Sequence, residues 1–171
     1  APLREKFADV RIANDGVAFR PHLLKAVSRT RGEILQQSTQ APTTIAIRPE
    51  NLAVIKSALI GVNREGTGKQ AFVGAAYISA GKTGTAQVYS LRGEKYSEKN
   101  TSERLRDHAW FMAYAPADKP RIAIAVLVEN GGFGAAAAAP IVRRVFDYYL
   151  TGAKPAPAAD VNLPAGEDES D

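Results

Sequence analysis

The stretch HAWFMAYAPADKPRIAIAVLVEN, residues 108 to 130, decides the fold class of this 171-residue chain. It holds two apolar runs around Ala-Asp-Lys-Pro at 117 to 120, and such runs on either side of a turn predict two antiparallel strands. The first strand is expected to end at Pro116. The second run, 121 to 130, is almost continuously apolar, which is typical of a strand buried on both faces and predicts a central strand.

A third strand is predicted upstream, from Gly81 onward in GKTGTAQVYSL at 81 to 91. The charged stretch from Arg92 to Asp107 has no apolar stripe and reads as a solvated loop that joins this strand to the other two. Strand alternation assigns the following residues to one face of the third strand: Thr83, Thr85, Gln87, Tyr89 and Leu91.

A helix is predicted after Gly-Gly-Phe-Gly, in PIVRRVFDYYL at 140 to 150. Val142, Phe146 and Leu150 form one apolar row at helical spacing, beside the row of Ile141, Val145 and Tyr149. Three strands followed by such a helix predict an α+β fold: an antiparallel sheet with a C-terminal helix packed on it.

The N-terminal part is predicted to mix helices and extended segments. A helix over 2 to 13 is expected to stop at the turn Asn14 to Gly16, and two extended segments are expected around Arg29 to Gly32. A second helix begins at Pro49 and is expected to end at Gly61 and the polar loop after it. Its apolar stripe is Leu52, Ile55, Leu59 and Val62.

Composition narrows the possible functions. With 45% hydrophobic and 23% charged residues the chain is globular, and its net charge of +4 is scattered, which gives nucleic-acid binding little support. The chain has no cysteine, and its two histidines, His22 and His108, are too far apart in sequence to indicate a metal pair. No apolar run approaches the length of a membrane span. Because the chain begins with Ala1, we expect a piece of a longer protein.

Gly81-Lys82-Thr83 matches the end of a phosphate-binding loop, but the match fails in spacing and context. The first glycine of that motif would fall at Ala76, and a strand pattern rather than a helix follows the lysine. Ser79 and Lys82 also match Ser-x-x-Lys, which requires a helix to bring the two side chains together. On a strand they should diverge, so the match is interpreted as accidental.

Lys82-Thr83-Gly84-Thr85 instead suits the cleft of a serine acyltransferase. The lysine supplies positive charge for a substrate carboxylate, the two threonines supply hydroxyl donors, and Gly84 leaves one side open to an acyl donor. A backbone N–H just beyond the glycine can face an oxyanion. We expect the amine and both hydroxyls to face one groove. Taken alone, the match is equally typical of a surface strand.

Four stretches resemble class B penicillin-binding proteins in order and spacing, most closely the elongation-type peptidoglycan D,D-transpeptidases. The resemblance covers residues 12 to 152. The four stretches are IANDGVAFRPHLLKAV, RPENLAVIKSALIGVNREGTG, GKTGTAQV and RLRDHAWFMAYAPADKPRIAIAVLVENGG.

This resemblance implies part of the penicillin-binding transpeptidase fold, which is like that of serine β-lactamases, over residues 1–152, with a disordered tail at 153–171. It implies substrate binding by Lys82, Thr83, Gly84 and Thr85, with the Thr85 N–H as one of two oxyanion donors, and neither metal nor cofactor. The implied partners are peptidoglycan stem peptides or lipid-linked precursors, β-lactam antibiotics and membrane proteins of the elongation complex. The implied location is the periplasmic face of the inner membrane.

Members of this family also carry the acylated serine on a Ser-x-x-Lys helix and a proton relay in Ser-x-Asn or Ser-x-Asp. We therefore expect the nucleophile and its base lysine to lie outside this chain, which should be inactive alone. The following serines are each followed at the second position by a residue other than Asn or Asp: Ser28, Ser38, Ser57, Ser79, Ser90, Ser97 and Ser102.

Two other interpretations stay open from the sequence: a fragment of a serine β-lactamase, which shares the Lys-Thr-Gly strand, and a non-catalytic module that binds a protein through its sheet. His108 opens the strand next to the Lys-Thr-Gly strand. It could support Lys82 or substrate, but a hydrogen-bonded structural histidine is the favoured interpretation. Trp110 and Phe111 are expected to belong to the core.

Overall fold

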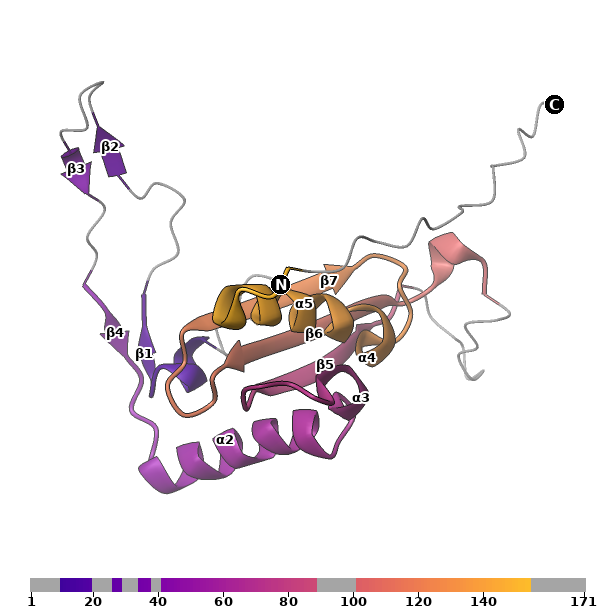
Figure 1. Cartoon of the computed structure of the whole chain (residues 1–171), viewed down its shortest axis with the longest axis horizontal. Coiled ribbons are helices and arrows are strands. Elements are labelled where there is room, and N and C mark those ends of the chain that lie inside the picture. The colour runs from indigo at the N-terminus through magenta and orange to yellow at the C-terminus, as the bar shows by residue number, and fades with distance from the viewer. Residues whose placement is uncertain (1–9, 20–25, 29–33, 38–40, 89–100, 155–171) are drawn as a thin grey trace.

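A three-stranded antiparallel sheet forms the centre of the computed structural model, which describes residues 10–19, 26–28, 34–37, 41–88 and 101–154. Its strands are β5 (Ala80–Ala86), β6 (His108–Ala115) and β7 (Ile122–Val128), in the spatial order β5-β6-β7 (Figure 1). The three predicted strands are therefore confirmed. The third strand is shorter than predicted: β5 ends at Ala86, residues 87 and 88 are described but are not strand, and residues 89–91 lie outside the described residues.

The middle position in this sheet belongs to β6, so the prediction that the strand at 121 to 130 is central was wrong for the described sheet. β6 pairs with β5 from Tyr114↔Ala80 to His108↔Ala86 and with β7 on its other edge. Most of β7 is only half-buried, and Leu127 is 37% exposed. A continuous apolar run shows that a strand is largely covered, but it does not show which strands pair with it.

Helices α3 (Lys69–Phe72), α4 (Gly134–Ala137) and α5 (Ala139–Thr151) cover one face of the sheet (Figure 1). The predicted C-terminal helix is confirmed, with Val142 and Phe146 fully buried from the expected row. The helix ends at Thr151, and the next residue, Gly152, has a left-handed φ of 75° that suits a C-terminal cap. The main core contains Phe72, Ala109, Phe111, Ala113, Ala115, Ala138, Ala139, Val142 and Phe146.

Helix α2 (Pro49–Arg64) lies along β5 and runs past Gly61, where the sequence predicted its end. It stops three residues later, at Arg64. The N–H groups of Glu65 and Gly66 both donate to the carbonyl oxygen of Gly61, at 2.9 and 2.8 Å. A Cβ at Gly66 would lie 2.9 Å from the Cα of Val62, so the chain turns where only glycine fits. Leu59 and Ile60 pack on a second cluster with Ala13, Ala80, Tyr114 and Ala117.

The N-terminal part contains two short antiparallel ribbons. Residues 10–13 are helical and are followed by the predicted turn, with positive φ at Asp15 and Gly16. Strand β1 (Val17–Ala18) pairs with β4 (Thr43–Thr44) (Figure 1), and β2 (Ala26–Ser28) pairs with β3 (Ile34–Gln37). The extended segments are thus confirmed. The expected turn at 29 to 32, helix residues 2 to 9 and most of the tail at 153–171 lie outside the described residues.

None of the helices in the described residues combines the length and the apolar character needed to cross a membrane.

Candidate active site

Strand β5 carries the Lys-Thr-Gly-Thr residues at one side of the sheet. Within the described residues it has a strand neighbour on one edge alone, β6. Thr83 pairs with Phe111 and Thr85 with Ala109, so the two threonines share a face as predicted. Lys82 pairs with Met112 and therefore starts from the opposite face.

The expectation that the amine and both hydroxyls face one groove was wrong in this respect, because neighbouring residues of a strand alternate between faces. The exposed side chain of Lys82 nevertheless bends along the strand. Its Nζ donates a hydrogen bond to the carbonyl oxygen of Thr83, at 2.6 Å. The amine of Lys82 therefore contacts the backbone carbonyl of Thr83, although the two side chains start from opposite faces of the strand.

Thr83 has a hydroxyl partner that the sequence interpretation missed. Its Oγ1 lies 3.0 Å from the Oγ1 of Thr67, in the loop between α2 and α3. From the sequence, this loop was predicted only as a helix end followed by polar residues. The one available signal was Gly66-Thr67-Gly68, in which two glycines bracket a hydroxyl side chain.

Gly84 lies in a tightly packed part of the sheet. A Cβ on Gly84 would lie 3.2 Å from the Cβ of Trp110, its partner on β6. Gly134 at the start of α4 sits against the same pair, because its Cβ would lie 2.6 Å from the carbonyl oxygen of Gly84 and closer still to that of Trp110. The glycine of the Lys-Thr-Gly motif is thus fixed within the close contact between α4 and the sheet.

Ser79 and Lys82 lie in different surroundings, as expected if their Ser-x-x-Lys spacing is accidental. Ser79 is buried, and its Oγ accepts a hydrogen bond of 2.9 Å from the Nδ2 of Asn63 on α2, whereas Lys82 is exposed. A buried serine bonded to Asn63 and an exposed lysine bonded to the Thr83 carbonyl do not resemble a nucleophile and its base, which lie within hydrogen-bond reach of each other.

His108 is hydrogen-bonded within the fold, which agrees with the favoured interpretation of a structural histidine. Its Nδ1 accepts a hydrogen bond from the N–H of Asn130 at 2.9 Å, and the residue pairs with Ala86, at the far end of β5 from Lys82. Asn130 also donates through Nδ2 to the carbonyl oxygens of Arg104 and Arg106. Of the two expected core aromatics, Phe111 is fully buried and Trp110 half-buried.

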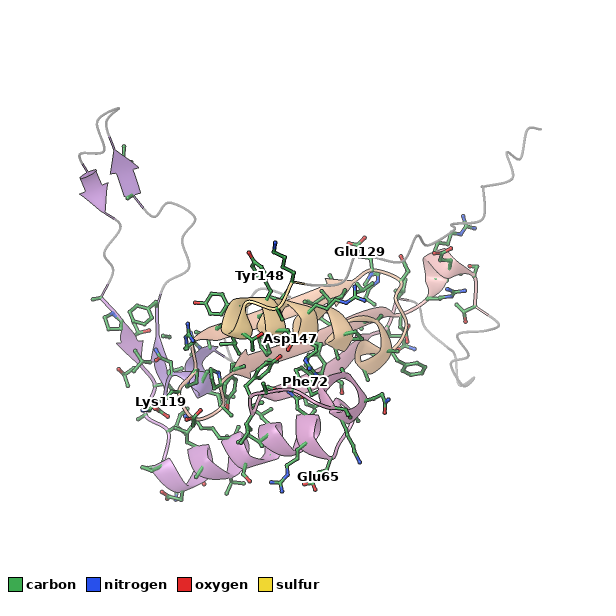
Figure 2. The ribbon with its side chains drawn as sticks, viewed as in Figure 1. Glu65, Phe72, Lys119, Glu129, Asp147 and Tyr148 are labelled. Carbon is green, nitrogen blue, oxygen red and sulfur yellow. The ribbon has the colours of Figure 1, made fainter. Side chains whose placement is uncertain are left out.

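Tyr77, just before β5, is held by α5. Its hydroxyl donates to the Oδ1 of Asp147 at 2.8 Å, and the Nε of Arg143 donates to both oxygens of that carboxylate. Figure 2 shows Asp147 on α5. The pKa of Tyr77 lies well above its ordinary value, chiefly because of burial and then because of its hydrogen bond to Asp147. Arg143 also donates to the carbonyl oxygens of Ala71 and Val73, so it fixes the segment that leads into β5.

A cavity of about 360 Å³ lies between α2, α3 and the segment that precedes β5. Asn63, Phe72, Tyr77 and Ser79 contribute to its wall, but none of the four motif residues does. We therefore centre the site on the strand and not on the cavity. Among the described residues, no group of three or more His, Asp or Glu side chains is arranged to hold a metal ion.

The transpeptidase domain of penicillin binding proteins matches residues 8–147, most of this chain. The chain therefore belongs to the penicillin-binding protein transpeptidase family. Among curated relatives, the peptidoglycan D,D-transpeptidase MrdA of Haemophilus influenzae is 40% identical over 155 residues, which cover 87% of this chain and 23% of that protein. The chain spans about a quarter of the length of the curated relatives it matches.

Solved structures agree with this assignment. Penicillin-binding protein A from M. tuberculosis, a ceftriaxone acyl-enzyme complex, has a TM-score of 0.71 and 30% identity, covering 87% of this chain and 32% of that one. Pseudomonas aeruginosa PBP2, in complex with WCK 5153, has a TM-score of 0.67 and 33% identity, covering 93% and 33%. The predicted fold class and the predicted resemblance to the elongation type are confirmed.

Proposed function

We propose that residues 1–152 are the C-terminal portion of the transpeptidase domain of an elongation-type peptidoglycan D,D-transpeptidase. The intact enzyme is acylated by a D-Ala-D-Ala stem peptide, releases D-Ala and cross-links peptidoglycan, and β-lactams acylate it in place of the substrate. One observation carries the proposal: in a chain of this family, the Lys-Thr-Gly-Thr sequence lies on β5, and within the described sheet β5 has β6 as a neighbour on one edge and no strand on the other.

Carboxylate binding is the role that we assign to this strand. The hydroxyls of Thr83 and Thr85 share a face, which suits two donors to the two oxygens of one carboxylate. The exposed ammonium group of Lys82, close to the Thr83 backbone, adds the positive charge that strengthens such hydrogen bonds. A stem peptide and a β-lactam both present a carboxylate of this kind.

Oxyanion stabilisation is assigned to the backbone N–H of Thr85. In an antiparallel strand, alternate residues direct their N–H and C=O groups to the same edge. The Thr83 carbonyl is reached by the Lys82 amine, which fits a carbonyl on the edge away from β6, and Thr85 is two residues further along. The second oxyanion donor and the acylated serine would belong to a part of the protein outside this chain.

The proposed setting is the periplasmic face of the inner membrane, in an elongation complex with membrane proteins. Support for a partner of this kind comes from a solved complex between Helicobacter pylori PBP2 and MreC. That PBP2 is 25% identical, with a TM-score of 0.54, and the match covers 71% of this chain and 22% of that one. The proposed ligands are stem peptides or lipid-linked precursors, and β-lactams.

The test is acylation of the intact protein by a fluorescent penicillin, compared between the wild type and the Lys82→Ala variant. We expect a labelled wild type and a Lys82→Ala rate lower by about tenfold or more, because a hydrogen bond to a charged partner contributes about 1.5–3 kcal/mol. Lys119→Ala, at an exposed lysine outside β5, is the matched control and should acylate at the wild-type rate. An unlabelled wild type, or equal rates for both lysine variants, would contradict the proposal.

A further inference from the structure

Two side-chain hydrogen bonds join the end of α2 and the following loop to β5 and to the residue just before it. Asn63 donates to Ser79 at 2.9 Å, and Thr67 and Thr83 share a hydroxyl–hydroxyl bond of 3.0 Å. The first bond is buried and structural. The second ends on a proposed ligand-binding group, so it has a consequence for chemistry that the first does not.

Thr67 is held in place by the two glycines beside it. A Cβ at Gly66 would lie 2.9 Å from the Cα of Val62, and one at Gly68 would lie 2.6 Å from the Oδ1 of Asn63. The N–H of Gly68 also donates to the carbonyl oxygen of Val62 at 2.9 Å. The loop is therefore packed against the end of α2 at a distance that a larger residue would disturb, and it presents the Thr67 hydroxyl to β5 from a fixed position.

Hydroxyl chemistry sets the direction of this bond when a ligand is present. A threonine hydroxyl has one hydrogen to donate and can accept further hydrogen bonds, whereas an ionised carboxylate only accepts. If Thr83 donates its hydrogen to a ligand carboxylate, the hydrogen between the two threonines must come from Thr67. Thr67 then donates its hydrogen to the Oγ1 of Thr83, and the hydroxyl hydrogen of Thr83 remains available to the ligand carboxylate.

We propose that Thr67 is a positioning residue that donates to the Oγ1 of Thr83 and so directs the Thr83 hydrogen toward the carboxylate of the substrate or β-lactam. This inference rests on the proposed function and adds to it. It assigns Thr67 no contact with the ligand, and its effect passes through Thr83 alone.

The experiment measures acylation rates of the intact protein with a penicillin and with its methyl ester, which lacks the anionic carboxylate. The Thr67→Val variant should lower the rate with the penicillin by about three- to tenfold, the range expected for the loss of one neutral hydrogen bond. The rate with the ester should stay unchanged. Thr67→Ser keeps the hydroxyl and should restore the wild-type rate, and Thr44→Val makes the same change on exposed strand β4 as a control.

A double-mutant cycle distinguishes positioning from a separate contact. In a Thr83→Val background, Thr67→Val should have no further effect, because the group through which it acts is gone. An equal loss with penicillin and ester, or an undiminished loss in the Thr83→Val background, overturns the inference. If the wild type is acylated and Thr67→Val matches it, the inference alone fails. If the wild type is not acylated, the proposed function fails, and the inference falls with it.

Discussion

Gly134 and Gly61 show at the scale of single residues how surroundings decide the effect of a methyl group. A Cβ at Gly134 would overlap the Trp110 carbonyl oxygen and lie 2.6 Å from that of Gly84, both backbone atoms that cannot move aside. A Cβ at Gly61, inside α2, would meet nothing nearer than the Oε1 of Glu65, at 3.7 Å.

Substituting alanine at these two positions should therefore have opposite results. Gly134→Ala should lower the free energy of unfolding by about 1–3 kcal/mol, as overpacking does, because α4 must move off the sheet. Gly61→Ala should raise it by about 0.5–1 kcal/mol, because alanine is the better helix former. Urea unfolding of the purified proteins measures both. A neutral Gly134→Ala would contradict the close contact of α4 with the Gly84–Trp110 pair.

The sequence reveals site residues that are consecutive, but not residues that are far apart in sequence and come into contact only in the fold. The motif Lys82 to Thr85 could be found because its four members are consecutive and alternate on a strand. Thr67 could not, because sixteen residues separate it from Thr83 and only the fold brings the two hydroxyls together. The strand alternation that places Thr83 and Thr85 on one face also places Lys82 on the opposite face, so the face of Lys82 was predictable from the sequence.

Helix α5 determines much of the packing at the scale of elements, and its two sides should respond differently to truncation. Phe146 is fully buried among Phe72, Phe111 and Val142, whereas Tyr148 is 59% exposed. Phe146→Ala should cost about 3–5 kcal/mol of unfolding free energy through the cavity it leaves. Tyr148→Ala, on the same helix, should cost less than about 0.5 kcal/mol. Similar losses for both variants would contradict the placement of α5.

The bond between Tyr77 and α5 predicts a dependence on pH. Because the folded protein raises the pKa of Tyr77, the neutral phenol is favoured in the folded state. The neutral phenol's contribution to the free energy of unfolding is fully present below the ordinary tyrosine pKa of about 10 and is lost as the pH rises above that value. Tyr77→Phe should therefore show a smaller loss of unfolding free energy above about pH 10 than the wild type. An unchanged alkaline dependence in urea titrations would contradict this assignment.

Element types were more predictable than element order. The alternation from Gly81 to Leu91 and the apolar run from His108 to Pro116 predicted strands, and the row through Val142 and Phe146 predicted α5, because each pattern is local. The position of β7 at one side of the described sheet depends on pairing, which no local pattern contains. Helix α3 was missed because its four residues are too few to show a helical period.

At the level of the whole chain, the proposed function separates residues that support the fold from residues that bind a ligand. The described residues contain the strand proposed to bind the carboxylate and the helices that pack on the sheet, and in their Ser-x-x-Lys match Ser79 is buried and Lys82 exposed. Truncation of Phe72 or Phe146 should therefore act on acylation through stability, whereas changes at Lys82, Thr83 and Thr67 should lower acylation by more than their effect on stability explains.

Peptide mapping by mass spectrometry, after incubation with penicillin, tests this account most directly. We predict a single penicilloyl group on the intact protein, attached to a serine outside residues 1–171, and no such group on the 171-residue chain alone. An adduct on a residue of this chain, Ser79 above all, would contradict the account, as would an intact protein that carries no adduct.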